Sequence, residues 1–311
     1  MNREDPGKRL AGTFPPGERW RARWRRMLGL LILALLLPAC SAIKIAYNQA
    51  PELLYWYFDA YVDFNDVQSA LARADLGRLQ AWHRQTQLPG YLPLLRDAQR
   101  QVTSDITSAQ ACEIYGDARR KVFAVYERAE PSVALLAASF DADQLRRMER
   151  RFAKGNAEYR AEFLDGTPEA VRARRMKKAV GRAEMLYGRL DDKQIALLDR
   201  MMAQPGFDAT RSYAERTRRQ RDALDTFRML AATPVPDRAV KADQAVKALM
   251  ERSLTSPDAA YRDYADAFVA RGCLSFSELH NSTLGAQRAR AAAVLNGYEK
   301  DLAALAAQNG V

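Results

Sequence analysis

The chain has 311 residues and a net charge of +10, with 48 Lys and Arg against 38 Asp and Glu. Its two histidines are too few for a His-rich metal site, and there is no Gly-rich phosphate loop, HExxH or GxSxG sequence. Scarce Gly and Pro, set against abundant Ala, Leu, Arg, Gln and Glu, favour helices. We therefore predict an all-α protein that needs no cofactor or metal and is not an enzyme.

Residues 1–39 are predicted to be an export signal that is cleaved. A cluster of arginines at residues 21–26 precedes an apolar run from Met27 to Ala39. This run has 13 residues, whereas about 20 are needed to span the hydrocarbon core of a bilayer. A basic region followed by a short apolar stretch is typical of a secretory signal peptide. The adjacent Arg25 and Arg26 leave twin-arginine export as an alternative route.

The end of the apolar run indicates lipid attachment. The sequence LPAC, residues 37–40, resembles the lipobox of bacterial lipoproteins. The resemblance implies that Cys40 is acylated and becomes the first residue of the mature protein. The non-acidic Ser41 implies sorting to the inner leaflet of the outer membrane, facing the periplasm, with the outer leaflet of the inner membrane as the alternative. A plain signal peptide with a chance Cys is the other interpretation.

The mature chain has 272 residues and room for one large domain or two small ones. The signal carries half of the net charge, so only +5 remains on the mature part. Two prolines between Thr233 and Pro236 interrupt any continuous helix and separate an N-terminal region, 40–232, from a C-terminal region, 237–311. We predict that these pack as one continuous domain, 45–308, built as a multi-helix bundle or an extended helical array.

Aromatic side chains crowd the start of the mature chain. The spacings from Tyr57 to Tyr61 and from Tyr61 to Phe64 place rings on one face of a helix. The simpler interpretation is a packed core. A surface near the membrane is the alternative, because the rings closely follow Cys40 and Tyr and Trp favour the membrane interface.

The next helical stretches are bounded by prolines and contain the first of two remaining cysteines. LPGYLP, residues 88–93, is expected to break one helix, and Pro131 to end or kink another. In an oxidising compartment, Cys112 and Cys273 are predicted to form a disulfide. Closing so long a loop contributes about 5 kcal/mol in the chain-entropy model. Two separately buried thiols are the alternative.

A short motif recurs three times. A large apolar residue is followed by Asp or Ser and, three residues after that, by Gln or Glu. Such a string predicts a helix start, with the Asp or Ser as N-cap and the Gln or Glu reaching back to it. The predicted cap pairs are Asp141 with Gln144, Asp191 with Gln194, and Ser275 with Glu278.

The first two copies also resemble the LTxxQ motif of a family of periplasmic helical proteins, with Asp in place of Thr. That family includes small ATP-independent chaperones and envelope-stress regulators, so the resemblance implies a client-holding or stress-sensing role. Capping boxes also arise by chance in helical proteins. Homology and coincidence therefore remain alternatives.

Positive charge is concentrated in the middle of the chain. Residues 140–230 contain 21 Lys and Arg against 15 Asp and Glu. A basic helical face commonly binds nucleic acid, but export removes that partner. Anionic envelope polymers, lipid head groups or acidic proteins are the available partners. A solvated surface with ion pairs one helical turn apart, such as Glu215 with Arg219, is the alternative.

Taken over its whole mature length, the chain resembles an uncharacterised family of proteobacterial lipoproteins. The lipobox, the aromatic block and GCLSFSELHNSTLGAQR, residues 272–288, carry the resemblance. It implies lipid anchoring at Cys40 and a helical fold, but no activity. We expect a lipid-anchored binding protein with an envelope protein or polymer as partner. A chaperone or stress sensor, and a cell-wall or lipid-modifying enzyme whose site the sequence does not reveal, are the alternatives.

Overall fold

A computed structural model describes residues 39–204 and 206–308, and within these ranges every regular element is a helix. The prediction of an all-α fold is confirmed. The helices, in chain order, are α2 (Ala39–Asn48), α3 (Ala50–Val62), α4 (Asp66–Trp82), the π-helix η1 (His83–Gln87), α5 (Leu88–Gln101), α6 (Ser108–Ala137), α7 (Ala142–Phe163), α8 (Pro168–Tyr187), α9 (Asp192–Ala203), α10 (Ala209–Ala232), α11 (Val235–Leu254), α12 (Ala259–Asn281) and α13 (Gly285–Ala306).

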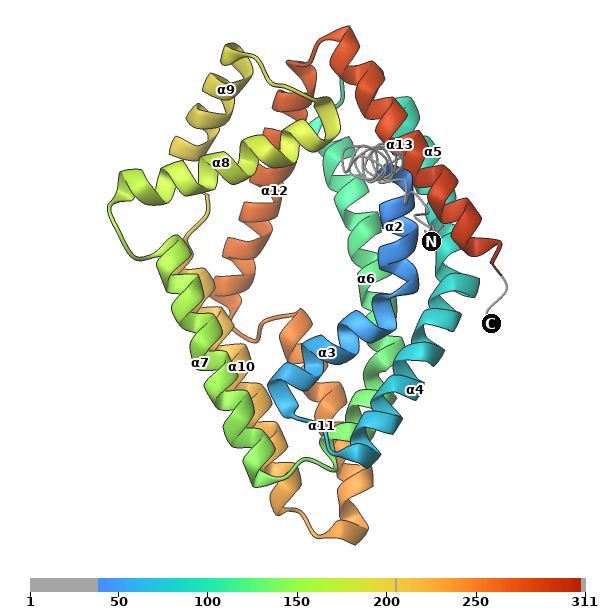
Figure 1. The fold of residues 1–311 in the computed structure, drawn as a ribbon. Coiled ribbons are helices and arrows are strands. Elements are labelled where there is room, and N and C mark those ends of the chain that lie inside the picture. Colours follow the sequence, from blue (N-terminus) through green and yellow to red (C-terminus); the bar gives the residue numbers. More distant parts are fainter. Residues whose placement is uncertain (1–38, 205, 309–311) are drawn as a thin grey trace, which may run out of the picture.

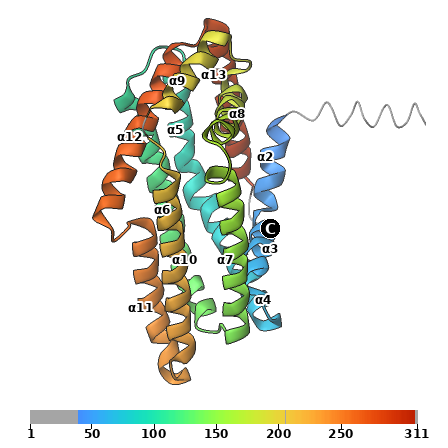
Figure 2. The same cartoon turned by 90° about the vertical axis from the view of Figure 1, so that its left-hand side faces the viewer.

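The helices form an elongated, flattened frame (Figure 1). Helices α7 and α10 run side by side along one long edge, and α4, α5 and α6 form the other. Helix α11 closes the lower end against α10 and α6, and α9, α12 and α13 form the upper end. Seen edge-on, the frame is thin, with α2, α3, α7 and α8 towards one broad side (Figure 2). The chain is therefore an extended helical array.

Two separate cores hold the ends of the frame. The lower core joins α3, α6, α7, α10 and α11. In it the rings of Phe140 and Phe227 meet edge to face, with their centroids 5.4 Å apart. Leu230 of α10 and Val246 of α11 are fully buried in it, so residues on both sides of the break at Thr233 share one core. The upper core joins α8, α9, α12 and α13 around Tyr187 and Ala291.

Several helices of these cores begin with the capping box, in which the N-cap side chain bonds the N3 amide while the N3 side chain bonds the N-cap amide. Both Asp141 and Asp191 are N-caps of this kind, with Gln144 and Gln194 at N3, so those two predictions are confirmed. Two further boxes, which were not predicted, are Asn65 with Gln68 at the start of α4 and Thr107 with Gln110 at the start of α6.

The N3 glutamines of α4 and α7 also bind each other. Gln144 Nε2 donates to Gln68 Oε1 at 2.6 Å, and Gln68 Nε2 donates to Gln144 Oε1 at 3.2 Å. Each amide group also donates to a main-chain carbonyl just before the partner helix, Gln68 to Ser139 and Gln144 to Asp63, both at 3.1 Å. The two helix starts are thereby joined through a buried, reciprocal glutamine pair.

A second reciprocal pair joins α9 to α13 in the upper core. Gln194 and Gln287 exchange hydrogen bonds of 2.8 and 2.9 Å. Gln194 also donates to the carbonyl of Ser282, and Gln287 to that of Arg189. In both pairs, the carbonyl that each glutamine binds belongs to the residue two positions before the N-cap of the partner helix. The same local arrangement therefore occurs once in each core.

The third predicted cap is wrong. Ser275 and Glu278 lie inside α12, which begins after Asp258, whose carboxylate accepts the amides of Ala260 and Tyr261. The chain turns between Asn281 and Gly285, and the last helix, α13, starts there. An N-cap residue must itself have a non-helical backbone. Because α12 already begins after Asp258, Ser275 has helical neighbours on both sides and cannot cap a helix.

The prolines interrupt less than expected. At LPGYLP the chain passes from η1 directly into α5, with Pro89 in the first turn, where its missing amide costs little, and Pro93 inside the helix. Likewise α6 continues past Pro131 to Ala137. The expected break at 88–93 is replaced by a π-helical turn, which widens the helix locally.

Candidate interaction surfaces

The aromatic block divides into a buried and an exposed part. Val62 is buried in the lower core, with Tyr61 and Phe64 packed against it. By contrast, Trp56 is 69 % exposed, Leu53 60 % and Tyr57 55 %. The core interpretation therefore holds only for the end of α3, and the rest of the helix carries an aromatic face of Leu53, Trp56, Tyr57 and the exposed Ala60.

Helix α3 is held in place by contacts opposite this aromatic face. The Tyr55 hydroxyl lies 3.0 Å from Ser69 Oγ, and the guanidinium of Arg73 stacks 3.6 Å from the Tyr55 ring. Arg73 also forms an ion pair with Glu52, and its hydrogen bond lowers the pKa of that carboxyl. Asp59 accepts the amide of Phe64 at 2.9 Å. The acidic groups of α3 thus each have a partner, and Glu52 also accepts a hydrogen bond from Trp56 of the aromatic face.

Helix α2 precedes α3 after a single residue and carries Cys40, the predicted lipidation site, in its first turn. Lys44 pairs with the buried Asp301 of α13 at 3.6 Å, which fixes α2 against the frame. Ile45 is 60 % exposed. The remainder of the predicted export signal, residues 1–38, lies outside the described residues.

A second apolar surface runs along the length of α6. Tyr115, Val122 and Tyr126 are all exposed, and their separations of seven and four residues place them on one side of the helix. They span roughly 16 Å at a rise of 1.5 Å per residue. Monomeric proteins rarely leave such a line of large apolar groups in water, so α6 is a candidate contact surface. It is called the α6 stripe below.

Part of the basic middle region holds helices together. Arg174 donates to the carbonyls of Ala161, Glu162 and Asp165 at the end of α7, and Arg172 pairs with Asp199 of α9. The predicted pair of Glu215 and Arg219 is present at 2.7 Å. Many of these charges are therefore structural.

The strongest ion network ties α10 to α11. Glu215 is buried and accepts two hydrogen bonds from Arg218, at 2.8 and 2.9 Å. Asp222 accepts two from Arg252, at 2.9 and 2.8 Å. Arg218 also donates to the main-chain carbonyl of Arg252 at 2.9 Å. Paired donors of this kind are the stronger class of charged hydrogen bond.

Both carboxyl groups of this network are held ionised. Burial raises the pKa of Glu215, but the hydrogen bonds from its arginine partners and Ser256 outweigh burial, and the pKa lies below its usual range. The hydrogen bonds from Arg252 likewise lower the pKa of Asp222. A general acid needs a raised pKa instead. The network is suited to stabilising the fold.

Among the shallow clefts in the described residues are two of about 350 Å³ each. The first lies over the ion network and is lined by Arg218, Arg221, Asp222, Asp225 and Arg252. The second lies between α5 and α6 and is lined by Gln87, Gly90, Leu94, Asp117, Arg120, Lys121 and Ala124. Neither is lined by a serine, threonine, cysteine or histidine, the side chains that pair as nucleophile and general base in acyl transfer.

Both histidines are bonded at both ring nitrogens. His83 contacts the hydroxyls of Tyr47 at 3.0 Å and Tyr91 at 3.1 Å, and burial lowers its pKa. His280 lies between the Tyr187 hydroxyl, at 2.9 Å, and the Ser104 carbonyl, at 2.8 Å. A carbonyl can only accept, so Nε2 of His280 donates to Ser104, and in the neutral ring Nδ1 then accepts from the tyrosine. Burial raises the pKa of Tyr187 to about 12, which keeps this hydroxyl protonated.

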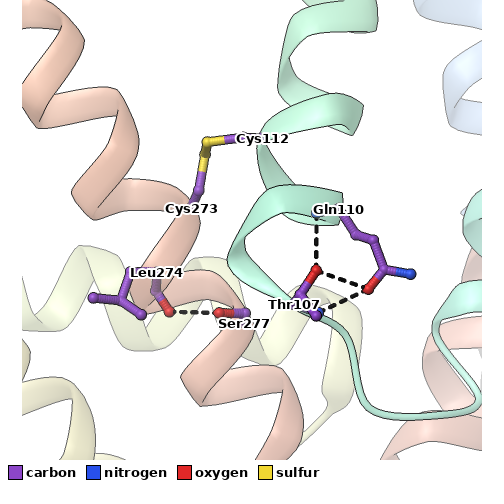
Figure 3. The surroundings of a disulfide bond; sticks show 6 residues. All are labelled: Thr107, Gln110, Cys112, Cys273, Leu274 and Ser277. Carbon is purple, nitrogen blue, oxygen red and sulfur yellow. Dashed lines mark hydrogen bonds between the residues drawn. A yellow bond between two sulfur atoms is a disulfide. The ribbon is translucent and has the colours of Figure 1, made fainter.

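The predicted disulfide is present in the structure (Figure 3). The sulfur atoms of Cys112 on α6 and Cys273 on α12 are 2.06 Å apart. They lie beside the capping box of Thr107 and Gln110, in a small apolar cluster with Ile106. The bond joins the upper end of α6 to α12, and 161 residues of sequence separate its two ends.

Within residues 39–204 and 206–308, no group of His, Cys, Asp and Glu side chains is arranged to hold a metal ion. Nor does any helix in this part of the chain combine the length and apolar character needed to cross a bilayer.

The region from the end of α3 to the start of α11 identifies the family. Residues 60–237 match the model of a family of unknown function, DUF6279. The chain belongs to this family. The match covers the Gln68 and Gln144 pair and the α6 stripe, which places both in the part of the chain that defines DUF6279. No curated protein and no solved structure matches the chain.

Replacing Glu215 by Gln tests the buried network. Because this removes the buried charge that two arginines bind, we expect the free energy of unfolding at pH 7 to fall by about 3 kcal/mol. A lowered native pKa gives stability that is present above the unfolded pKa of about 4.3 and is lost as pH falls through the native value. When the free energy of unfolding is measured against pH, it should therefore fall more steeply below about pH 4.3 in the unchanged protein than in Glu215→Gln.

The exposed pair of Glu149 and Arg228, 3.1 Å apart, supplies the matched control. Glu149→Gln is expected to change the free energy of unfolding by less than about 1 kcal/mol, because exposed ion pairs contribute little. Equal effects of the two substitutions would show that the Glu215 network does not stabilise the fold.

Proposed function

We propose that this DUF6279 protein is a lipid-anchored, non-enzymatic binding protein of the bacterial envelope. Acylated at Cys40, it is held on the inner leaflet of the outer membrane and faces the periplasm. The LPAC sequence supports the anchor, and the disulfide suits an oxidising compartment.

The observation that carries the binding role is the α6 stripe. Its large side chains remain in water on a helix that is otherwise fixed at its start by a capping box and a disulfide, and at its end by the lower core. A rigid helix with an exposed apolar line can bind a partner without first ordering itself, which lowers the entropy cost of association. The partner is an apolar segment of an envelope protein.

An ATP-independent chaperone or stress sensor is the second candidate. The specific observation in its favour is ITSAQ, residues 106–110, in which Thr107 is the N-cap and Gln110 the N3 residue of α6. This copy has Thr where the LTxxQ motif has it, unlike the Asp copies at 141 and 191. Partly unfolded clients would bind the same stripe.

The anchor is tested by Cys40→Ala. We expect this variant to lose incorporation of radiolabelled palmitate and to leave the membrane fraction. The double variant Cys112→Ala with Cys273→Ala is the control, because it removes the other two cysteines and should keep the label. Palmitate labelling that survives Cys40→Ala would refute the lipobox assignment.

The binding surface is tested by placing a photoreactive amino acid at single positions of the full chain in cells. At Val122, which is 53 % exposed on the α6 stripe, we expect crosslinks to an envelope protein. Val240, 65 % exposed on α11, is the matched control and should give at least about tenfold less product, because it lies outside the stripe and binding energy concentrates in a few central contacts. Equal crosslinking at both positions, or none at Val122, would contradict the proposal.

A further inference from the structure

The aromatic face of α3 is exposed and does not pack against the rest of the frame. Leu53, Trp56, Tyr57 and Ala60 adjoin one another at spacings of three and four residues, and Leu54 and Phe58 extend the exposed arc. The contacts of α3 with the frame come from Glu52, Tyr55, Asp59 and the end of the helix. An apolar surface of this size on one exposed helix marks an interaction site.

The place of α3 in the chain indicates which surface covers it. Helix α2 starts directly after the apolar run that ends at Ala39, and α3 follows α2 after Gln49. At 1.5 Å per residue, Trp56 lies no more than roughly 24 Å from Cys40 along the chain. Both helices lie along the same broad side of the frame (Figure 2). A lipid on Cys40 therefore places this side close to a bilayer.

The side chains of the face suit the interfacial layer of a bilayer. Tryptophan and tyrosine prefer this layer because one end of the ring is apolar and the other polar. Trp56 Nε1 donates to Glu52 at 3.3 Å and the Tyr57 hydroxyl to Tyr61 at 3.4 Å, so the polar ends are satisfied within α3 itself. The rings can enter the head-group region without leaving an unpaired donor.

Charge on this side is compatible with anionic head groups. The flanking acids are neutralised, Glu52 by Arg73 and Asp63 by Arg147 at 2.8 Å. Helix α8, on the same broad side, carries Lys177 and Arg182 at exposed positions. Basic residues close to an anionic membrane surface are attracted to it.

We propose that the face formed by α2 and α3 lies against the anionic leaflet that holds the lipid on Cys40, so that the frame rests flat on the membrane. This inference relies on the lipid anchor proposed above. The lipid supplies one attachment, and the aromatic face supplies the second that stable membrane binding needs. In this orientation the frame is fixed relative to the bilayer and cannot turn freely on its anchor.

The test uses the full chain, purified from membranes and reconstituted into vesicles of phosphatidylethanolamine and phosphatidylglycerol with bromine on the upper part of the acyl chains. The acylated chain begins at Cys40, so Trp20 and Trp24 leave with the signal and its tryptophans are Trp56 and Trp82. One variant carries Trp82→Phe and retains Trp56, and the other carries Trp56→Phe and retains the half-buried Trp82. Tryptophan emission is compared with that in unbrominated vesicles, and flotation measures attachment.

An interfacial helix buries its apolar face about 5–10 Å deep, so brominated lipid should lower Trp56 emission about twofold and leave Trp82 emission nearly unchanged. If the chain floats with the vesicles while Trp56 is not quenched, the inference is wrong and the lipid anchor stands. If the chain does not float, both are wrong. If high protein density alone prevents the brominated lipid from lowering Trp56 emission, a second copy of the chain covers the face. The inference is then again wrong.

Discussion

The reciprocal glutamine pair is the interaction on which this fold depends. At each end of the frame, two helices start side by side, and each leaves main-chain amides that helical bonding does not satisfy. The paired glutamines bond the N-cap amides, the carbonyls before the caps and each other, so one buried contact satisfies both starts. Glutamate would cap equally well but has no donor and carries a charge. The pair therefore explains why Gln68, Gln144, Gln194 and Gln287 are all glutamines.

The two pairs allow the frame to be stable although its cores are small and far apart. Each core is closed at its helix starts, and α6 with the disulfide to α12 connects one core to the other. A scaffold fixed in this way can leave the α6 stripe and the aromatic face of α3 in water, because neither surface is needed for packing. Membrane attachment through α3 would leave the α6 stripe free for a partner.

The helical class and the caps at Asp141 and Asp191 could be predicted from the sequence because they depend on residue types at short spacing. The disulfide could be predicted because Cys112 and Cys273 are the two cysteines that remain after Cys40. The Gln287 partner was missed because Leu284, which has no side-chain oxygen, stands where a cap would be sought. The false cap at Ser275 shows the converse, a capping string inside a helix that Asp258 already starts. Whether the rings of α3 are buried is decided by tertiary contacts, so the sequence could not separate Val62 from Trp56.

The stability of Gln144→Glu compared with Gln110→Glu tests the central claim most directly. Both residues occupy N3 of a capping box, but only Gln144 belongs to a reciprocal pair. Because Glu at position 144 removes two donors and buries a charge, denaturant unfolding should show a loss of about 2–4 kcal/mol. Gln110→Glu should change the free energy of unfolding by less than about 0.5 kcal/mol, since glutamate serves the capping box as well. Similar small effects at both positions would contradict the account.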